Sequence, residues 1–269
     1  MSLFERKLIA RIQRRRGPSN CGVLGIFQPI ADALKLLFKA SPLEGHSAIT
    51  ICGICLLFTI SLCQMTLIPI YTRDLVYEYG LLLVALCHSL ITFSEVLVGI
   101  SSGSRYGIIG GNRVYVQNLG SHLSFAMMII AVMLVTGSAS ISAIPFSWEY
   151  IPLAVTLFIT ILLMASRIPF DFTEAESELV GGAYVEYGGI LFALIYLSDY
   201  LNLLFISALY ATLFLSTASS IILFCETIFV AFFIILLRAM LPRYTQMQMI
   251  KIVWEIIIPM IALLICFVL

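Results

Sequence analysis

The chain has 269 residues, of which 61% are hydrophobic and 11% charged, whereas a soluble domain is roughly 45–50% apolar and about 25% charged. The apolar residues form long uninterrupted runs without ten-residue alternation, which excludes a soluble protein and a membrane β-barrel. Net charge is zero, and the basic residues flank apolar runs and form no basic domain, which argues against nucleic-acid binding. We therefore expect an all-α integral membrane protein.

The N-terminal segment is basic, and Gly17-Pro-Ser-Asn20 interrupts it. No apolar core follows Met1, so we expect no cleavable signal peptide. Residues 25–39 show a helical, amphipathic pattern that is too short and too charged to cross a bilayer. This pattern predicts a helix lying in the membrane interface. We assign residues 1–47 to a basic segment and this interfacial helix.

Seven apolar segments follow, each long enough to cross about 30 Å of hydrocarbon. They form a transmembrane helical domain over residues 48–268, in which the polar cluster at 216–220 separates two nearly continuous spans. We expect the spans at about 48–70, 79–100, 114–137, 150–167, 187–208, 218–238 and 248–268.

The basic residues indicate the orientation. With the N-terminus inside, all but one of the fifteen Lys and Arg residues fall on the inner side, and only Arg73 faces out. The acidic loop 168–186 then lies on the inner side with the basic N-terminal segment.

The chain offers little for metal or redox chemistry. Its seven cysteines are scattered, and the one tight pair, Cys52-x-x-Cys55, lies in an apolar run without a flanking His. We interpret these cysteines as small buried hydrophobes and predict no metal site. Walker, zinc and nucleophile-elbow motifs are absent from the sequence.

The loop 168–186 holds five of the chain's fifteen acidic residues. Thr173-x-x-Glu176 fits a capping box, which predicts a short helical turn. A solvated loop explains such a stretch, and so does a proton or ligand site, because crowded carboxylates favour protonated forms. The five carboxylates are Asp171, Glu174, Glu176, Glu178 and Glu186.

The candidate charges inside predicted spans are Glu95, His122, Asp199, Glu226 and Glu255, of which Glu255 lies close to Lys251 near the inner interface. A charge at the bilayer centre costs at least about 2.5–3.5 kcal/mol, so such residues are functional candidates. For His122, a satisfied core residue is the alternative.

Several motifs resemble subunit 1 of respiratory complex I, NADH:quinone oxidoreductase, and the resemblance covers nearly the whole chain. The most specific runs Arg167-x-Pro-Phe-Asp-x-Thr-Glu-x-Glu-Ser-Glu-Leu-Val-x-Gly-x-x-Val-Glu-Tyr187. The others are Glu5-Arg-Lys, Arg15-Arg-Gly-Pro18, Gln28-Pro-Ile-Ala-Asp-Ala-Leu-Lys35 and Ser104-Arg-Tyr106.

The resemblance implies a heel subunit that forms the membrane side of a ubiquinone tunnel and couples quinone reduction to proton translocation. It implies ubiquinone as substrate, no NADH, flavin or iron–sulfur cluster in this chain, and the other complex I subunits and lipid as partners. By position it implies tunnel or entrance roles for Arg6, Asp32, Lys35, Arg113 and Arg167. It also implies a coupling loop of Asp171, Glu174, Glu176 and Glu178, and a proton path through Glu186 and Asp199.

Three departures from the family pattern stand out. The family has a whole span before Glu-Arg-Lys, which we expect a separate polypeptide to supply or evolution to have removed. The family usually has Glu at the positions of His122 and Met164, and an apolar residue where Glu95 stands. We hypothesise that Glu95 partly replaces those carboxylates, together with His122, which can titrate near neutral pH. This requires Glu95 to lie near His122 and Asp199.

Two alternatives to a complex I subunit stay open, a stand-alone proton or ion transporter and a structural anchor with a weakened proton path. The expected location is the mitochondrial inner membrane with a matrix-side N-terminus, and the alternative is a bacterial plasma membrane.

Overall fold

The computed structural model describes residues 1–19, 21–39, 47–68, 78–141, 144, 148–172, 179–215 and 220–268. In these residues all regular structure is helical, which confirms the all-α expectation, and six helices are long and apolar enough to cross a membrane. These six are α3 (Ala48–Thr66), α4 (Gly80–Ser101), α5 (Arg105–Thr136), α8 (Gly189–Phe214), α9 (Ser220–Met240) and the run of α10 (Gln246–Lys251), η5 (Ile252–Ile257, a π-helical turn) and α11 (Ile258–Val268). Helix α6 (Ile151–Met164) is a shorter apolar helix. The smaller elements are α1 (Ser2–Ile12), η1 (Val23–Gly25), α2 (Gln28–Phe38), η3 (Trp148–Tyr150) and η4 (Gly182–Tyr184).

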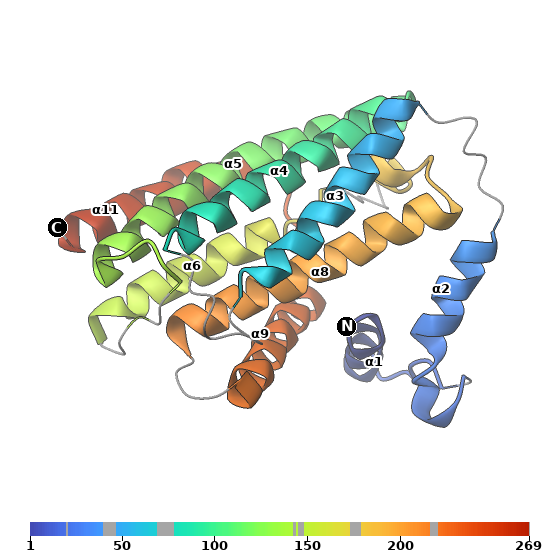
Figure 1. The fold of residues 1–269 in the computed structure, drawn as a ribbon, viewed down its shortest axis with the longest axis horizontal. Coiled ribbons are helices and arrows are strands. Elements are labelled where there is room, and N and C mark those ends of the chain that lie inside the picture. The colour runs from blue at the N-terminus through green and yellow to red at the C-terminus, as the bar shows by residue number, and fades with distance from the viewer. Residues whose placement is uncertain are drawn as a thin grey trace.

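The spanning helices form one bundle (Figure 1). Helix α4 packs between α3 and α5, α3 also contacts α8, and α5 and α8 both contact the short helix α6. Helix α9 packs on the outer side of α8 and contacts α1, while α2 contacts α8. Because successive spans alternate in direction, the ends of α4, α6 and α9 meet the starts of α5, α8 and α10 at one end of the bundle.

The helix boundaries follow local capping rules. The Ser47 side chain accepts a hydrogen bond from Thr50 N at the start of α3, and Thr245 with Gln248 forms a capping box before α10. Helix α5 ends at Gly137 in the left-handed conformation that glycine adopts without strain. Helix α6 has 14 residues, or about 21 Å, which is less than the about 30 Å of hydrocarbon that a straight spanning helix crosses.

The helix of the third expected span begins earlier than residue 114. Arg105–Arg113 is not a loop before the helix, because α5 begins at Arg105, where the Ser104 side chain accepts a hydrogen bond of 3.0 Å from Gly107 N. Gly107, Gly110 and Gly111 lower the intrinsic helix propensity of this segment. In the bundle they permit close packing, since a Cβ on Gly110 would lie 2.4 Å from Ala183 N.

The cysteine pair on α3 is also placed differently from the expectation. Cys52 and Cys55 are exposed on the outer side of the helix and are not buried. The buried side of α3 carries instead Gly53, Ile54, Leu57, Ser61 and Gln64. The helical period separates these two sets of residues, and the cysteines therefore belong to the surface of the isolated chain.

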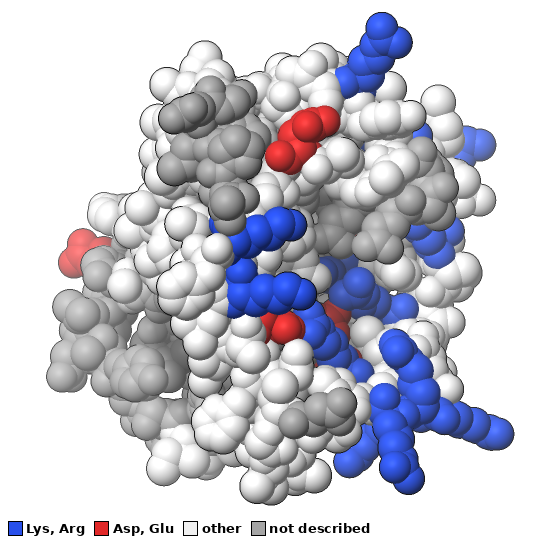
Figure 2. All heavy atoms as spheres, turned by 90° about the vertical axis from the view of Figure 1, so that its right-hand side faces the viewer, with Lys and Arg blue, Asp and Glu red and all other residues white. Residues whose placement is uncertain are grey.

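The charged residues gather at the end of the bundle where α1, α2 and the α4–α5 junction lie. Figure 2 shows this end, with Lys and Arg atoms clustered around a small acidic area. Arg73, the single basic residue expected on the outer side of the membrane, lies outside the described residues.

Candidate functional site at the charged end of the bundle

A pocket opens among the spans near their charged end, with an empty space of about 330 Å³ that includes the solvent at its mouth. It brings together three residues predicted to be functional, Glu95, Arg167 and Asp199, which come from α4, the segment after α6, and α8. Glu95 and Arg167 are buried, and Asp199 is half-buried. The complete lining is Glu95, Ala165, Ser166, Arg167, Tyr184, Asp199 and Asn202.

Gln117 on α5 holds the segment that carries Arg167. Its amide nitrogen donates hydrogen bonds to the backbone oxygens of Leu163 at 3.2 Å and Phe170 at 2.9 Å. The bond to Leu163 satisfies a carbonyl at the C-terminal end of α6 that has no partner within the helix. Sequence reasoning missed Gln117, although a polar side chain inside an apolar span was a usable signal.

Two further contacts hold the other walls of the pocket. The Tyr187 hydroxyl donates a hydrogen bond of 2.7 Å to the backbone oxygen of Val98 on α4. Close approach of Gly110 to Ala183 seats η4, which carries Tyr184, directly on α5. The pocket walls are therefore held by side-chain hydrogen bonds to backbone oxygens and by one close approach between backbones.

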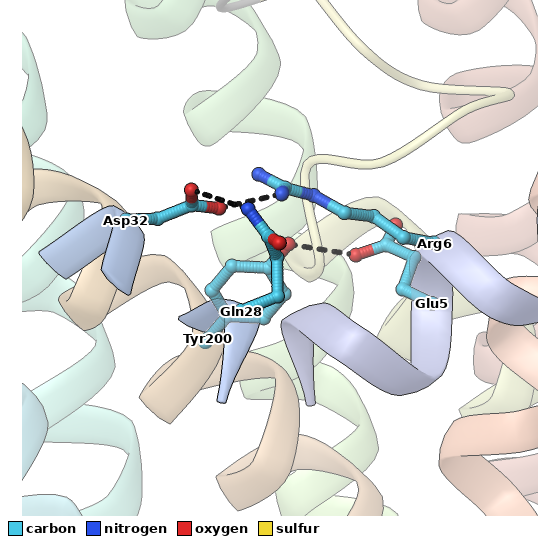
Figure 3. Close-up of polar contacts among 5 residues, drawn as sticks. All are labelled: Glu5, Arg6, Gln28, Asp32 and Tyr200. Atoms are coloured by element: carbon cyan, nitrogen blue, oxygen red, sulfur yellow. Dashed lines mark hydrogen bonds and ion pairs between the residues drawn. The ribbon is translucent and has the colours of Figure 1, made fainter. Parts of the chain in front are cut away.

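A polar network connects the pocket to α1. The Arg167 guanidinium lies over the Tyr200 ring, 5.2 Å from its centroid. The Tyr200 hydroxyl donates a hydrogen bond of 2.9 Å to the Glu5 carboxylate, as Figure 3 shows. Glu5 also forms a hydrogen-bonded ion pair with Arg238 on α9. Sequence reasoning assigned no role to Glu5, although an acid in an otherwise basic helix was a usable signal.

The predicted entrance residues Arg6 and Asp32 are brought together beside this network (Figure 3). Arg6 donates to Asp32 at 2.6 Å, and the Gln28 amide donates to the same carboxylate at 3.0 Å. The hydrogen bond to Asp32 raises the pKa of the Arg6 guanidinium above its ordinary value. Lys35 is exposed farther along α2, and Arg113 is half-buried on α5; neither lines the pocket.

Polar side chains continue from Glu95 into the interface between α4 and α5. The Asn118 amide donates a 3.4 Å hydrogen bond to Glu95, and one helical turn farther on each helix the Thr92 hydroxyl is hydrogen-bonded to the His122 ring. Glu95 therefore borders the pocket with Asp199 and lies one helical turn from the Thr92–His122 pair. The role of Glu95 in place of the missing carboxylates stays a prediction.

The acidic loop is described only at its two ends. Asp171 is half-buried, and Glu186 is exposed between η4 and α8 and does not line the pocket. Glu174, Glu176 and Glu178, with the predicted helical turn at Thr173, lie outside the described residues.

Comparison with known proteins identifies the family. The sequence profile described as NADH dehydrogenase matches residues 1–269. NADH-ubiquinone oxidoreductase chain 1 of Cyanidium caldarium is 34% identical over 284 residues, covering 97% of this chain and 83% of the relative. A bacterial relative, from the NADH-quinone oxidoreductase of Rickettsia prowazekii (strain Madrid E), is 33% identical over 285 residues, covering 96% of this chain and 84% of the relative.

A third relative has a similar level of identity. NADH-ubiquinone oxidoreductase chain 1 of Bradypus variegatus is 31% identical over 277 residues, covering 97% of this chain and 87% of the relative. These matches confirm the resemblance seen in the motifs, and the chain belongs to the NADH dehydrogenase family, among the membrane subunits that include chain 1 of NADH-ubiquinone oxidoreductase.

Proposed function

We propose that the chain is the membrane subunit of a proton-translocating NADH:ubiquinone oxidoreductase. It forms part of the quinone tunnel and couples quinone reduction to proton movement. Family membership and the names of the relatives support the reaction, in which ubiquinone takes up two electrons and two protons to become the quinol. The electrons reach the quinone from partner subunits of the complex.

One observation carries the coupling role, namely the pocket that joins Glu95, Arg167 and Asp199 inside the bundle. Carboxylates in this low-dielectric setting respond strongly to a change in nearby charge. Negative charge on the reduced quinone would favour protonation of Glu95 and Asp199. Protonation of the quinone would remove that negative charge. Glu95 and Asp199 would then lose the protons that they had taken up, and those protons would pass along the path.

The network at α1 supports the entrance role. Arg6 and Asp32 lie at the same charged end as the pocket, and Tyr200 connects Glu5 to Arg167. A polar headgroup passing from α2 towards Arg167 would meet charged and hydrogen-bonding side chains in succession. The acidic loop, from Asp171 to Glu178, would extend the coupling path beside Arg167. With the N-terminus facing the mitochondrial matrix, this end would face the peripheral subunits.

The test compares Asp199→Asn with Asp199→Glu in the assembled complex in sealed membrane vesicles. NADH-dependent ubiquinone reduction and the resulting proton gradient are measured together. Asp199→Asn, which removes the ionisable group, is expected to lower coupled turnover about tenfold or more, and Asp199→Glu is expected to retain most of it.

Glu178→Gln tests the loop in the same assay, with an expected loss of proton movement per quinone reduced. Normal pumping in both Asp199→Asn and Glu178→Gln would reject the coupling role and leave a structural anchor. A proton current without quinone turnover would favour a stand-alone transporter.

A further inference from the structure

His88 on α4 is a buried titratable side chain that the proposed function does not yet use. It is 1% exposed, and among the described residues neither of its ring nitrogens has a hydrogen-bond partner. Burying such a polar group without a partner costs about 1–3 kcal/mol, which a residue with only a packing role would not require. The position therefore calls for a function.

The nearest titratable partner of His88 is His122 on the facing helix α5. The two ring centroids lie 5.0 Å apart, with an angle of 49° between the ring planes. The Thr92 hydroxyl is hydrogen-bonded to His122 Nε2 and also lies 3.3 Å from the His88 backbone oxygen. Two imidazoles, the buried one of His88 and the half-buried one of His122, therefore lie side by side between α4 and α5, and the second is bound to a hydroxyl that can relay a proton.

The pair continues the polar line that starts at the pocket. On α4, Glu95, Thr92 and His88 follow one another at helical spacing, and on α5 Asn118 and His122 do the same. The Asn118–Glu95 and Thr92–His122 contacts connect the two rows. The line runs from the pocket shared with Asp199 to the level of His88.

A second unpartnered polar group lies at that level. Gln64 on α3 is fully buried, and neither atom of its amide has a partner among the described residues. Helices α3 and α4 are antiparallel, and a Cβ on Gly53 would lie 3.2 Å from Val98. Three helical turns farther along α3, this register places Gln64 opposite the turn of α4 that contains His88.

We propose that His88 carries protons between His122 and the region of Gln64, so that a line from Glu95 through Thr92, His122 and His88 conducts protons deeper into the membrane, while the Asn118 amide orients the Glu95 carboxylate. The proposal rests on the proposed function, which delivers protons to the start of this line. Imidazole can accept a proton at one ring nitrogen and release one from the other. When one proton enters at one ring nitrogen and another leaves from the other, His88 ends neutral in its second tautomer. Rotation of the ring or exchange of the ring proton restores the first tautomer, so no net charge or proton accumulates on His88.

A structural role for His88 is the competing explanation, because its ring also packs edge-on against Phe125 with centroids 5.6 Å apart. His88→Phe keeps an aromatic ring of similar shape and removes the proton-carrying nitrogens. His88→Gln keeps a polar group that does not titrate near neutral pH. Ser89→Ala, at the neighbouring exposed position of α4, is the matched control.

The experiment uses the assembled complex in sealed vesicles and measures protons moved per ubiquinone reduced, together with the solvent deuterium isotope effect on turnover. The proposal expects His88→Phe and His88→Gln to lower proton-coupled turnover about tenfold or more, at equal amounts of assembled complex. Ser89→Ala should match the unmodified complex.

Three outcomes separate this inference from the function on which it rests. Loss of pumping in both His88 variants and in Asp199→Asn supports it. Normal pumping and an unchanged isotope effect in His88→Phe, with pumping lost in Asp199→Asn, overturns the role of His88 and leaves the coupling function standing. Normal pumping in Asp199→Asn and Glu178→Gln rejects the coupling function itself, and with it the proton supply that the inference needs.

Discussion

The Glu5 carboxylate on α1 forms an ion pair with the Arg238 guanidinium at the end of α9, across 233 positions of sequence. Their side chains are 4% and 22% exposed, whereas the nearby Arg6–Asp32 pair is 51% and 37% exposed. Glu5 also accepts the hydrogen bond from Tyr200, so one carboxylate connects α1 with α8 and α9. This contact attaches the basic N-terminal helix to the bundle.

Glu5→Ala is expected to lower the free energy of unfolding by about 3–5 kcal/mol, because it leaves the largely buried Arg238 without its counter-charge. Asp32→Ala removes an ion pair of the same kind at a solvated site, and about 0–1 kcal/mol is expected. Denaturation of the full chain in mixed detergent micelles measures both. Equal losses of unfolding free energy for the two variants would show that burial of the Glu5–Arg238 pair does not increase its contribution to stability.

Gly110→Ala is expected to destabilise the packing of η4 against α5, since the added Cβ would lie 2.4 Å from the backbone nitrogen of Ala183. Backbone cannot move aside as a flexible side chain can, so the cost should reach at least about 1–3 kcal/mol. Thermal unfolding followed by circular dichroism provides the measurement.

Gly188→Ala is the control for that substitution. A Cβ at Gly188 would meet nothing within 4 Å, and its φ of −136° suits any residue. A change within about 0.5 kcal/mol is therefore expected. If the two alanine variants melt together, the contact between α5 and η4 is looser than the structure indicates.

Gln117→Leu should loosen the segment between α6 and the acidic loop. The substitution removes the donor to the carbonyls of Leu163 and Phe170. The Leu163 oxygen keeps the bond from Ser166 N, and leaving the Phe170 oxygen unsatisfied costs about 1–3 kcal/mol. Because this segment carries Arg167 into the pocket, the KM for ubiquinone is also expected to rise.

Exposed Asn112 on the same helix offers the comparison. Asn112→Leu should leave both stability and KM close to those of the unmodified complex. Unchanged kinetics in Gln117→Leu, despite a lower melting temperature, would mean that the position of Arg167 does not govern quinone access.

Apolar length alone was enough to predict the long apolar helices, because about 20 apolar residues have few stable environments other than a membrane. The motif that begins at Arg167 was enough to predict the family. The start of α5 was missed because its glycines weaken local helix propensity, and the compensating contact at Ala183 comes from a segment some 70 residues later. The helix α1 was missed because its basic composition gave no apolar period, while its stability comes from the Glu5–Arg238 contact.

The sequence by itself determined that this is an all-α membrane chain of the NADH dehydrogenase family, with most of its basic residues at the ends of its spans. Hydropathy and motif are local properties, and they can be read along the chain. Only the tertiary structure decided that Glu95, Arg167 and Asp199 share one pocket, and that His88 lies beside His122. Such proximity depends on which faces of separate helices meet, and that is set by side-chain packing between segments far apart in sequence.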